Sequence, residues 1–508
     1  MILINPPIVK PSEPPAGIGK LSGALRAANI RHYINDANIE GIYYLLNNAP
    51  GPTDTWTRRA FRHLSHNLDA LKGRDIYRNI DRYKRAVMDV NRILEYAAAG
   101  KGTRLSLADY YHPNLSPVKS RDLIYAAEHP EENPFFSYFS TRLPELVESE
   151  SIGTAGFSIN YLSQALTAFA MIGFLKREFP HVMVIAGGGL ITSWMRNPGW
   201  KNPFRGLLDH CIPGPGEKPL LEILGRKVLK KGDYRPYYDL LPVKDYLSPG
   251  FVLPFSTSKG CYWGKCAFCP ETAEGNRYVQ RRPDSVIDDL SYLVKQFSPV
   301  LIHLTDNAIS PVMMRKIVER PPGAPWYGFT RVVDYFADTD FCRALKDSGC
   351  VMLKLGLESG DQRVLDCMHK GCNIKTASNV LKAIKKAGIS TYIYLLFGTP
   401  SETIEEARNT LAFVADHCDY IDFMNLAVFN LPVNSLEARE VDTVDFYDGD
   451  LSLYNDFRHP EGWGRRQVRE FLDKEFKRNA AVQSIMRKQP QFFTSNHAPF
   501  FIMEQEIQ

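Results

Sequence analysis

The segment Ser258-Lys-Gly-Cys261-Tyr-Trp-Gly-Lys-Cys266-Ala-Phe-Cys269-Pro-Glu271 places three cysteines on one loop. Four residues separate the first two cysteines, and two residues separate the last two. Soft thiolate ligands this close together are typical of a metal or cluster site. A structural zinc site normally has four ligands, and neither a second Cys-x-x-Cys pair nor a histidine pair at finger spacing follows Cys269. A 4Fe-4S cluster held by three cysteines leaves one iron without a protein ligand. The loop therefore favours a cluster that binds a substrate or cofactor at that iron.

The cysteine loop follows the first strand of a regular alternation of strands and helices. We predict strands near residues 251–257, 300–305, 326–330, 351–357, 390–397 and 419–427. Helical stretches lie between them at 284–297, 311–319, 338–348, 374–388 and 402–416. Five strand–helix units leading to a sixth strand indicate a partial parallel barrel with its site at the carboxyl ends of the strands. After residue 430 we expect a helix at 466–477 and an aromatic tail at 492–501 that packs on the barrel.

The N-terminal part shows a second alternation. A strand at 2–4, a helix at 17–28 and a strand at 33–34 precede an insertion of about residues 45–150 with basic, aromatic helices. Strands at 153–159, 182–186 and 209–212 then alternate with helices at 161–179 and 219–231. Repeated βα units indicate a Rossmann-like, doubly wound parallel sheet, and we interpret the basic helices of the insertion as solvated faces. The fold class is therefore α/β, with domains at 1–235, 236–430 and 431–508.

Composition excludes several classes of protein. The 508 residues are 44% hydrophobic and 23% charged, as in globular domains. A net charge of +4 from 61 basic and 57 acidic residues indicates no nucleic-acid surface. The most apolar stretch, 165–175, is too short to cross a membrane, and no signal-peptide pattern opens the sequence, so we expect a cytoplasmic protein without a transmembrane segment. Nine cysteines, an odd number, favour reduced thiols over a disulfide framework.

With Phe268 before its third cysteine, the loop resembles that of the radical S-adenosylmethionine (SAM) superfamily, although the usual first gap is three residues. The segments 355–360 with 364–371 and 393–403 look like that family's fourth strand with its helix and its fifth strand with its glycine turn. The resemblance implies a partial (β/α)6 barrel in which Cys261, Cys266 and Cys269 bind a 4Fe-4S cluster. It also implies reductive cleavage of SAM to methionine and a 5′-deoxyadenosyl radical, which abstracts hydrogen from an unactivated carbon.

The same resemblance implies which residues contact SAM: Phe268, Asp306, Glu358 and Gly398. Glu358 takes the position that hydrogen-bonds the ribose. Asp306 ends the second barrel strand, and two roles stay open for it: binding the ammonium group of SAM or capping the following helix. The implied partners are an electron donor such as flavodoxin or ferredoxin and a small-molecule or lipid-like substrate, without nucleic acid. No residue is assigned as a catalytic acid or base.

The N-terminal unit resembles the cobalamin-binding domain that precedes the barrel in one large subgroup. The implied cobalamin-binding residues are Pro6, Asp36, Gly187, Gly188, Thr192, Gly214 and Glu217. The sequence Asp36-Ala-Asn38 lacks the histidine of the Asp-x-His-x-x-Gly motif, so cobalamin would bind without an axial protein imidazole. The implied reaction is cobalamin-dependent C-methylation of an unactivated carbon.

Two alternatives stay open for the function. One is radical SAM dehydration, rearrangement or carbon–carbon coupling without catalytic cobalamin. The other is a non-catalytic, metal-stabilised binding module. The remaining cysteines favour neither, because we expect all of them to be small buried thiols and not ligands of an auxiliary cluster. They are Cys211, Cys342, Cys350, Cys367, Cys372 and Cys418.

Overall fold

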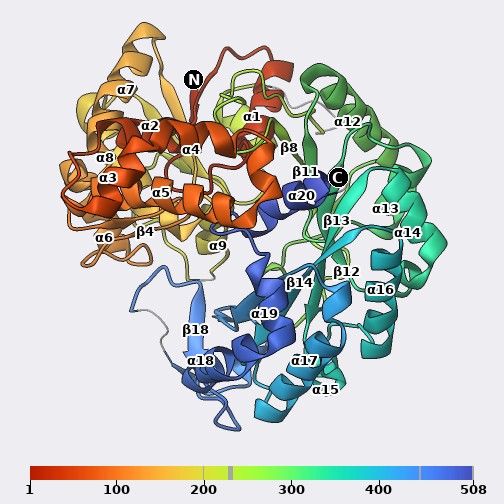
Figure 1. The fold of residues 1–508 in the computed structure, drawn as a ribbon. Helices are drawn as coiled ribbons and strands as arrows, with labels where there is room; N and C mark the ends of the chain where they lie inside the picture. The colour runs from red at the N-terminus through yellow and green to blue at the C-terminus, as the bar shows by residue number, and fades with distance from the viewer. Residues whose placement is uncertain (198, 227–232, 445–447, 506–508) are drawn as a thin grey trace. The chain divides into compact units, whose positions relative to one another are not determined.

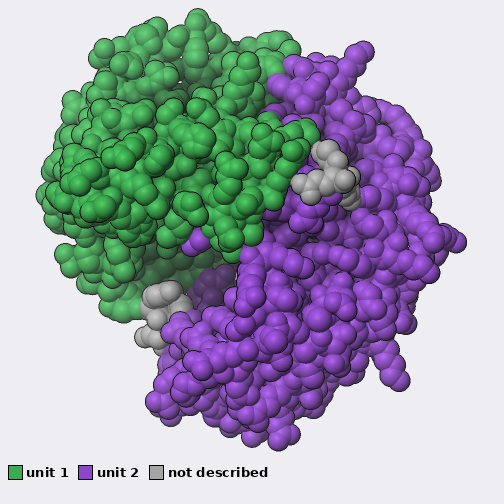
Figure 2. Space-filling model, in the orientation of Figure 1, with its two compact units in different colours: residues 1–250, 448–453 green, residues 251–447, 454–508 purple. Residues whose placement is uncertain are grey.

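The computed structural model describes residues 1–197, 199–226, 233–444 and 448–505, which divide into two compact units (Figure 2). Unit 1 comprises Met1–Gly250 with Asp448–Leu453, and unit 2 comprises Phe251–Tyr447 with Tyr454–Gln508. The division after Gly250 lies beyond the boundary we predict at residue 235. Residues 236–250 stay with unit 1 because they bond to its N-terminal segment, for example through Leu247 N–H to Pro11 O at 2.7 Å.

Unit 1 contains a five-stranded parallel sheet in the order β2-β1-β5-β6-β7, and Figure 1 labels several of the helices that accompany it. The strands are β1 (Ile2–Ile4), β2 (Tyr33–Asn35), β5 (Thr154–Ser158), β6 (Met183–Gly187) and β7 (His210–Cys211). Helices α1 (Ala16–Ala27), α2 (Ala37–Asn48), α8 (Leu162–Glu178), α9 (Gly189–Arg196) and α10 (Glu217–Ile223) follow these strands. The chain proceeds from β1 to β2 on one side and returns to β5 on the other, so the predicted doubly wound sheet is confirmed, with its switch point between β1 and β5.

The insertion between α2 and β5 is mainly helical. It contains α3 (Thr55–Arg62), α4 (Leu64–Leu71), α5 (Ile80–Ala99), β3 (Arg104–Leu105), β4 (Tyr110–Tyr111), α6 (Ser120–Glu128) and α7 (Phe136–Ser149). Residues 448–453 join unit 1 here, because Leu451 N–H donates to Val118 O at 2.9 Å and Asp450 accepts from Ser120 N–H at 2.8 Å. Among the described residues, no helix has the length and apolar character that crossing a membrane requires.

Unit 2 contains a six-stranded parallel sheet in the order β15-β14-β13-β12-β11-β8. The strands are β8 (Val252–Phe255), β11 (Leu301–Leu304), β12 (Trp326–Arg331), β13 (Cys350–Glu358), β14 (Ser390–Phe397) and β15 (Phe423–Val428). Helices α12 (Pro283–Phe297), α13 (Pro311–Glu319), α14 (Thr339–Asp347), α15 (Gln362–Cys367), α16 (Ile374–Lys386) and α17 (Ile404–Asp416) connect them. The sheet leaves β8 and β15 as its two edges, which confirms the predicted partial barrel. Strand β13 is buried along its whole length.

Local sequence explains where these helices begin. Ser310 accepts a hydrogen bond from Met313 N–H and precedes Pro311, the first residue of α13. Thr403 and Glu406 form a reciprocal capping box at the start of α17. These caps lie just beyond the carboxyl ends of β11 and β14, so they fix the loops of the edge where a parallel sheet places its site.

The rest of unit 2 surrounds this sheet. A small hairpin of β9 (Ser258–Lys259) and β10 (Val279–Gln280) encloses the cysteine loop and α11 (Pro270–Ala273). After β15 come β16 (Leu431–Pro432), β17 (Thr443–Val444), β18 (Tyr454–Phe457), α18 (Arg465–Lys474), α19 (Ala480–Arg487) and α20 (Thr494–Gln505). Helix α20 packs against β13 and β14, and Phe500 and Phe501 are buried, so the expected packing of the aromatic tail on the barrel is confirmed.

Candidate functional site

The three cysteines of the loop lie close enough to influence one another electrostatically. Burial raises the pKa of Cys266 to about 11, and the nearby Lys370 ammonium opposes that shift. Burial also raises the pKa of Cys269, while the backbone N–H groups of Thr272 and Glu271 lower it. A negative charge on Cys269 raises the pKa of Cys266, and a charge on Cys261 raises that of Cys269. The thiols therefore form one electrostatically coupled group.

This arrangement fits a cluster better than a single ion. In the described part of the chain, no three His, Cys, Asp or Glu side chains converge tightly enough to hold one metal ion. A cluster makes a different demand, because each thiolate binds a separate iron. Two buried cations, Lys370 and Arg331, favour the thiolate form of Cys266. Three coupled thiols beside two buried cations thus fit an anionic iron–sulfur cluster.

Glu358 at the end of β13 forms a buried ion pair with Lys370. The Lys370 ammonium donates to Glu358 Oε1 at 2.7 Å. Burial lowers the pKa of Lys370, but the Glu358 carboxylate and a negative charge on Cys266 together outweigh that effect and raise the pKa. A Cβ at Gly356 would lie 2.8 Å from both charged groups, so a side chain there would displace the ends of this pair. Glu358 itself has φ +69°, a backbone conformation that is uncommon for residues other than glycine and that sets the direction of its side chain at the carboxyl end of β13.

Asp306 follows β11, and its carboxylate is bonded to the start of the cysteine loop. One carboxylate oxygen accepts from Thr257 N–H at 2.9 Å, and the other accepts from the hydroxyls of Thr257 and Ser258 at 2.8 and 2.5 Å. The helix-capping role is wrong because Ser310 caps α13. With three internal donors bonded to it, the buried Asp306 anchors the start of the cysteine loop.

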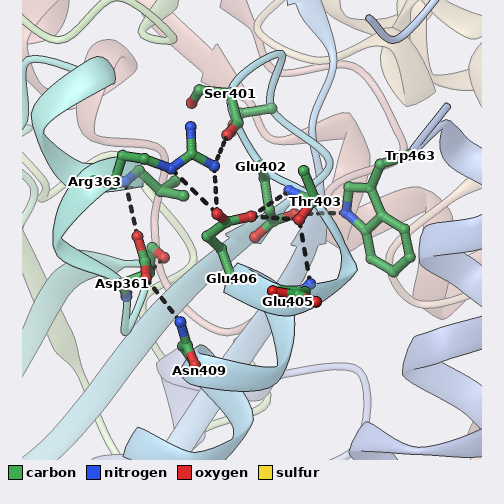
Figure 3. A network of polar contacts seen from close by, with 12 residues as sticks. Asp361, Arg363, Ser401, Glu402, Thr403, Glu405, Glu406, Asn409 and Trp463 are labelled. Atoms are coloured by element: carbon green, nitrogen blue, oxygen red, sulfur yellow. Dashed lines mark hydrogen bonds and ion pairs between the residues drawn. The ribbon is translucent and has the colours of Figure 1, made fainter. Parts of the chain in front are cut away.

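Gly398 directly follows β14 and has a left-handed backbone conformation, with φ +83°. Its N–H donates to Glu402 Oε2, which also accepts from the indole N–H of Trp463 at 2.9 Å (Figure 3). Burial raises the pKa of Glu402 to about 7, and the two donors only partly offset that cost. Within the described structure, Glu402 Oε1 is buried without a hydrogen-bond partner. Trp463 thus ties the segment before α18 to the glycine turn.

A second network fixes the same turn from the side of α17. Arg363 donates to Glu406 Oε1 at 3.1 Å and to Ser401 O at 2.8 Å, while Thr403 donates to Glu406 Oε2 (Figure 3). Charge-assisted bonds of this kind are among the stronger ones. Residues 398–406 are consequently held by Trp463 on one side and by Arg363 on the other.

In unit 1 the structure brings four of the predicted cobalamin residues together. Thr192 Oγ1 donates to Gly188 O at 2.7 Å and accepts from Gly214 N–H at 2.9 Å, so it joins the loops after β6 and β7. Gly188, at φ +106°, approaches the backbone so closely that a Cβ would lie 2.4 Å from Ile159 O. Gly187 precedes it at the end of β6 and is half-buried. Around Gly214 no atom lies within 4 Å of a Cβ position, which leaves open space for a ligand.

Pro6 and Asp36 lie elsewhere, in the core of unit 1. Asp36 is 1% exposed, and its carboxylate accepts from Asn5 Nδ2 at 2.8 Å and from the Tyr246 hydroxyl at 2.5 Å. Pro6 is also buried. Asp36 thereby stabilises the loop after β1, and cobalamin contacts of Pro6 and Asp36 stay predictions. Glu217 begins α10 directly after the Gly214 loop.

The other cysteines differ from the prediction at three positions. Cys342, Cys350 and Cys372 are buried, as expected. Cys367 is exposed, however, and Cys211 and Cys418 are half-buried. Cys367 ends α15 on its solvent side, a place that sequence spacing alone does not reveal.

Sequence reasoning missed four residues that organise this edge of unit 2: Arg331, Lys370, Glu402 and Trp463. Lys370 lies in the segment 364–371 that resembles the family, and Arg331 directly follows the strand predicted at 326–330, so the positions of both gave a signal. Glu402 and Trp463 had none, because their contact joins residues far apart in the chain.

Comparison with known proteins places the cysteine loop within a family. The model for the "Radical SAM superfamily" matches residues 255–414. An uncharacterised methyltransferase of Pyrococcus horikoshii is 29% identical over 275 residues, which are 49% of this chain and 56% of that protein. The anaerobic magnesium-protoporphyrin IX monomethyl ester cyclase of Rubrivivax gelatinosus is 27% identical, over 38% of this chain and 35% of its own length.

One further sequence relative and one solved structure of similar fold are methyltransferases. The cytidylyl-2-hydroxyethylphosphonate methyltransferase of Streptomyces wedmorensis is 26% identical over 42% of each chain. These alignments span about a third to just over half of the curated relatives' own lengths. The solved structure of TsrM from Kitasatospora setae, a radical S-adenosylmethionine methyltransferase with cobalamin and a 4Fe-4S cluster bound, has TM-score 0.53 and 17% identity. It covers 87% of this chain and 77% of TsrM, and the likeness is one of fold.

Proposed function

Because residues 255–414 of this chain form a radical SAM domain, we propose that the protein uses a 4Fe-4S cluster, SAM and cobalamin to methylate an unactivated carbon. When bound, the cluster supplies the electron that cleaves SAM, and cobalamin supplies a carrier for the methyl group. The chain's own residues bind and orient these groups and exclude water from them. One observation carries the proposal: three coupled thiols lie beside the buried Glu358–Lys370 pair.

In unit 2, Cys261, Cys266 and Cys269 are the cluster ligands, and Phe268 and Glu358 contact SAM. Lys370 holds one oxygen of Glu358 and leaves the other to accept from the ribose hydroxyls. Gly398 shapes the turn beside this site through its left-handed backbone. Asp306 acts at a distance by anchoring Thr257 and Ser258.

In unit 1, the loops after β6 and β7 bind cobalamin. The open space beside Gly214 lets the ligand approach the backbone, and Thr192 holds that loop to Gly188. No imidazole is offered from the loop after β2, where Asn38 bonds to both N–H and C=O of Val9 at 2.9 and 3.0 Å. Cobalamin is therefore held by backbone and by shape, without a histidine of this motif.

The proposal extends to partners and location. The substrate is a small or lipid-like molecule, and a flavodoxin or ferredoxin delivers the electron in the cytoplasm. All nine cysteines are free thiols, which fits a reducing compartment.

The proposal is tested by anaerobic reconstitution with iron, sulfide and hydroxocobalamin. We expect about four irons and about one cobalt per chain, with reductant-dependent conversion of SAM to 5′-deoxyadenosine or S-adenosylhomocysteine. A chain that takes up iron but no cobalt would contradict the cobalamin part alone.

A second candidate function rests on the similarity to the anaerobic cyclase of Rubrivivax gelatinosus. In this case the substrate radical would rearrange or cyclise without receiving a methyl group. SAM carrying a labelled methyl group separates the two: label leaving SAM as anything other than methionine supports methylation, and label recovered only in methionine supports the second function.

A further inference from the structure

Trp263 lies within the four-residue gap between Cys261 and Cys266 and is bonded to another part of unit 2. Its indole N–H donates to His369 O at 3.0 Å. The Lys265 ammonium lies 5.0 Å from the centroid of the indole ring. Gly371 has φ +60°, and a Cβ there would lie 2.3 Å from the indole. The segment 368–371 is therefore shaped to receive this side chain.

Arg331, the last residue of β12, packs against the indole ring of Trp263. Its guanidinium carbon lies 3.8 Å from the centroid of the indole ring. The same group donates to Lys370 O and, at 3.3 Å, to Gly371 O. Arg331 is 4% exposed, so these contacts form away from water, where a cation–π contact is strongest.

A second attachment holds the loop beyond Cys266. Ala267 N–H donates to Met368 O at 3.0 Å, and the Lys370 ammonium lies 5.5 Å from the centroid of the Phe268 ring. The loop is thus attached to residues 368–371 on both sides of Cys266. Between these attachments, Gly264 turns the chain with φ +58°.

We propose that Trp263 and Arg331 are positioning residues that hold the four-residue gap in the one conformation that presents Cys261 and Cys266 to a cluster. The inference rests on the proposed function and names how this chain accommodates a gap one residue longer than the usual one. Each additional loop residue adds conformational freedom that must be removed before the thiolates can converge. The packed indole removes it. Arg331 also places a buried positive charge near Cys266, which favours the more negative, reduced state of the cluster.

The test compares reconstituted full-length variants Trp263→Ala, Trp263→Phe, Arg331→Lys and Arg331→Met. Trp56→Ala is the matched control, since Trp56 is 42% exposed and lies in unit 1. Two quantities are measured: the rate at which a chelator removes iron, and the midpoint potential from a redox titration followed by electron paramagnetic resonance. Unfolding of each apoprotein, followed by circular dichroism, reports folding.

We expect Trp263→Ala to lose iron at least ten-fold faster than wild type, and Trp263→Phe to lie between them because it keeps the stacking but lacks the N–H donor. Arg331→Met should lose iron faster and shift the midpoint potential to more negative values. Arg331→Lys should keep the wild-type potential but not the wild-type retention, because an ammonium lacks the planar fork. A purely structural role would not separate these two readouts.

Equal rates of iron loss in wild type and Trp263→Ala overturn the inference. If Trp263→Ala does not fold, Trp263→Phe and Arg331→Lys carry the test, and wild-type iron retention in both overturns it. A wild-type chain that takes up no cluster contradicts the proposed function, and the inference with it, whereas a loaded wild type with indifferent variants contradicts the inference alone.

Discussion

The ammonium of Lys370 lies 2.7 Å from Oε1 of Glu358, and both side chains are buried at the carboxyl end of β13. The pair links the end of β13 to the cysteine loop electrostatically, because the Lys370 ammonium also lowers the pKa of Cys266. Removing one member of such a buried pair leaves an uncompensated charge.

We predict that Lys370→Met destabilises unit 2 by about 3–5 kcal/mol, because the Glu358 carboxylate then stays buried without its partner. The double variant Lys370→Met/Glu358→Gln should recover most of the loss, since neither residue is then charged. Denaturant unfolding of the apoprotein measures both. Equal stability of the single and double variants would show that the pair is not coupled.

A second prediction concerns SAM binding. Glu358→Gln keeps the shape of the side chain but removes its charge, so we expect affinity for SAM to fall about ten-fold or more while iron content stays unchanged. Equilibrium binding to the reconstituted protein gives the affinity, and single-turnover cleavage as a function of pH gives a separate readout. Unchanged affinity with a shifted pH profile would mean that Glu358 transfers protons.

The buried Glu402 predicts a pH-dependent stability. Its pKa is raised from 4.5 to about 7 in the fold, so the native state holds a proton that the unfolded state releases between these values. Stability from this residue is therefore present below about pH 4.5 and is lost as pH rises to about 7. Relative to Glu402→Gln, wild type should lose about 2–3 kcal/mol between about pH 5 and about pH 8. A constant difference between the two proteins across this range would contradict the prediction.

A further prediction asks whether Asp306 positions the cysteine loop or binds SAM. Asp306→Ala removes three bonds to Thr257 and Ser258, so we expect faster loss of iron from the cysteine loop. The SAM affinity of the fraction that still holds iron should stay within about two-fold of wild type. A large loss of SAM affinity with full iron retention would return Asp306 to the predicted role of ammonium ligand.

In unit 1, we expect alanine substitutions at two glycines to have opposite effects on folding. Gly188→Ala should prevent correct folding, because its Cβ would meet the Ile159 backbone at 2.4 Å. Gly214→Ala meets no atom within 4 Å and carries only the left-handed backbone cost of about 1–2 kcal/mol. It should fold and take up less cobalamin, as cobalt analysis would show. Full cobalt uptake by Gly214→Ala would remove this loop from the proposed site.

The sequence predicted the parallel sheets well because strands buried on both faces are mainly apolar, as at 350–358 and 390–397. Element ends were less predictable. The sixth barrel strand begins at Phe423, not near 419, because residues 418–420 form a short 3-10 turn. The helix predicted at 219–231 ends at Ile223, and residues 227–231 of that prediction lie outside the described residues.

The candidate site was predictable only where one short segment carries it. The three cysteines share a loop, so spacing alone named them, and they lie within residues 255–414, which match the radical SAM superfamily model. The hydrogen bond between Asp36 and Tyr246 was not predictable, because the two residues lie far apart in the sequence. The contact between Trp463 and Glu402 could not be predicted either, because the two residues are distant in sequence and share no local pattern.

The most direct test of the central claim is anaerobic single-turnover cleavage of SAM by wild type and by the triple variant Cys261→Ala/Cys266→Ala/Cys269→Ala. The account predicts about four irons per wild-type chain with reductant-dependent cleavage, and neither iron nor cleavage in the triple variant. A triple variant that retains a full complement of iron, or a fully loaded wild type that leaves SAM intact, would contradict it.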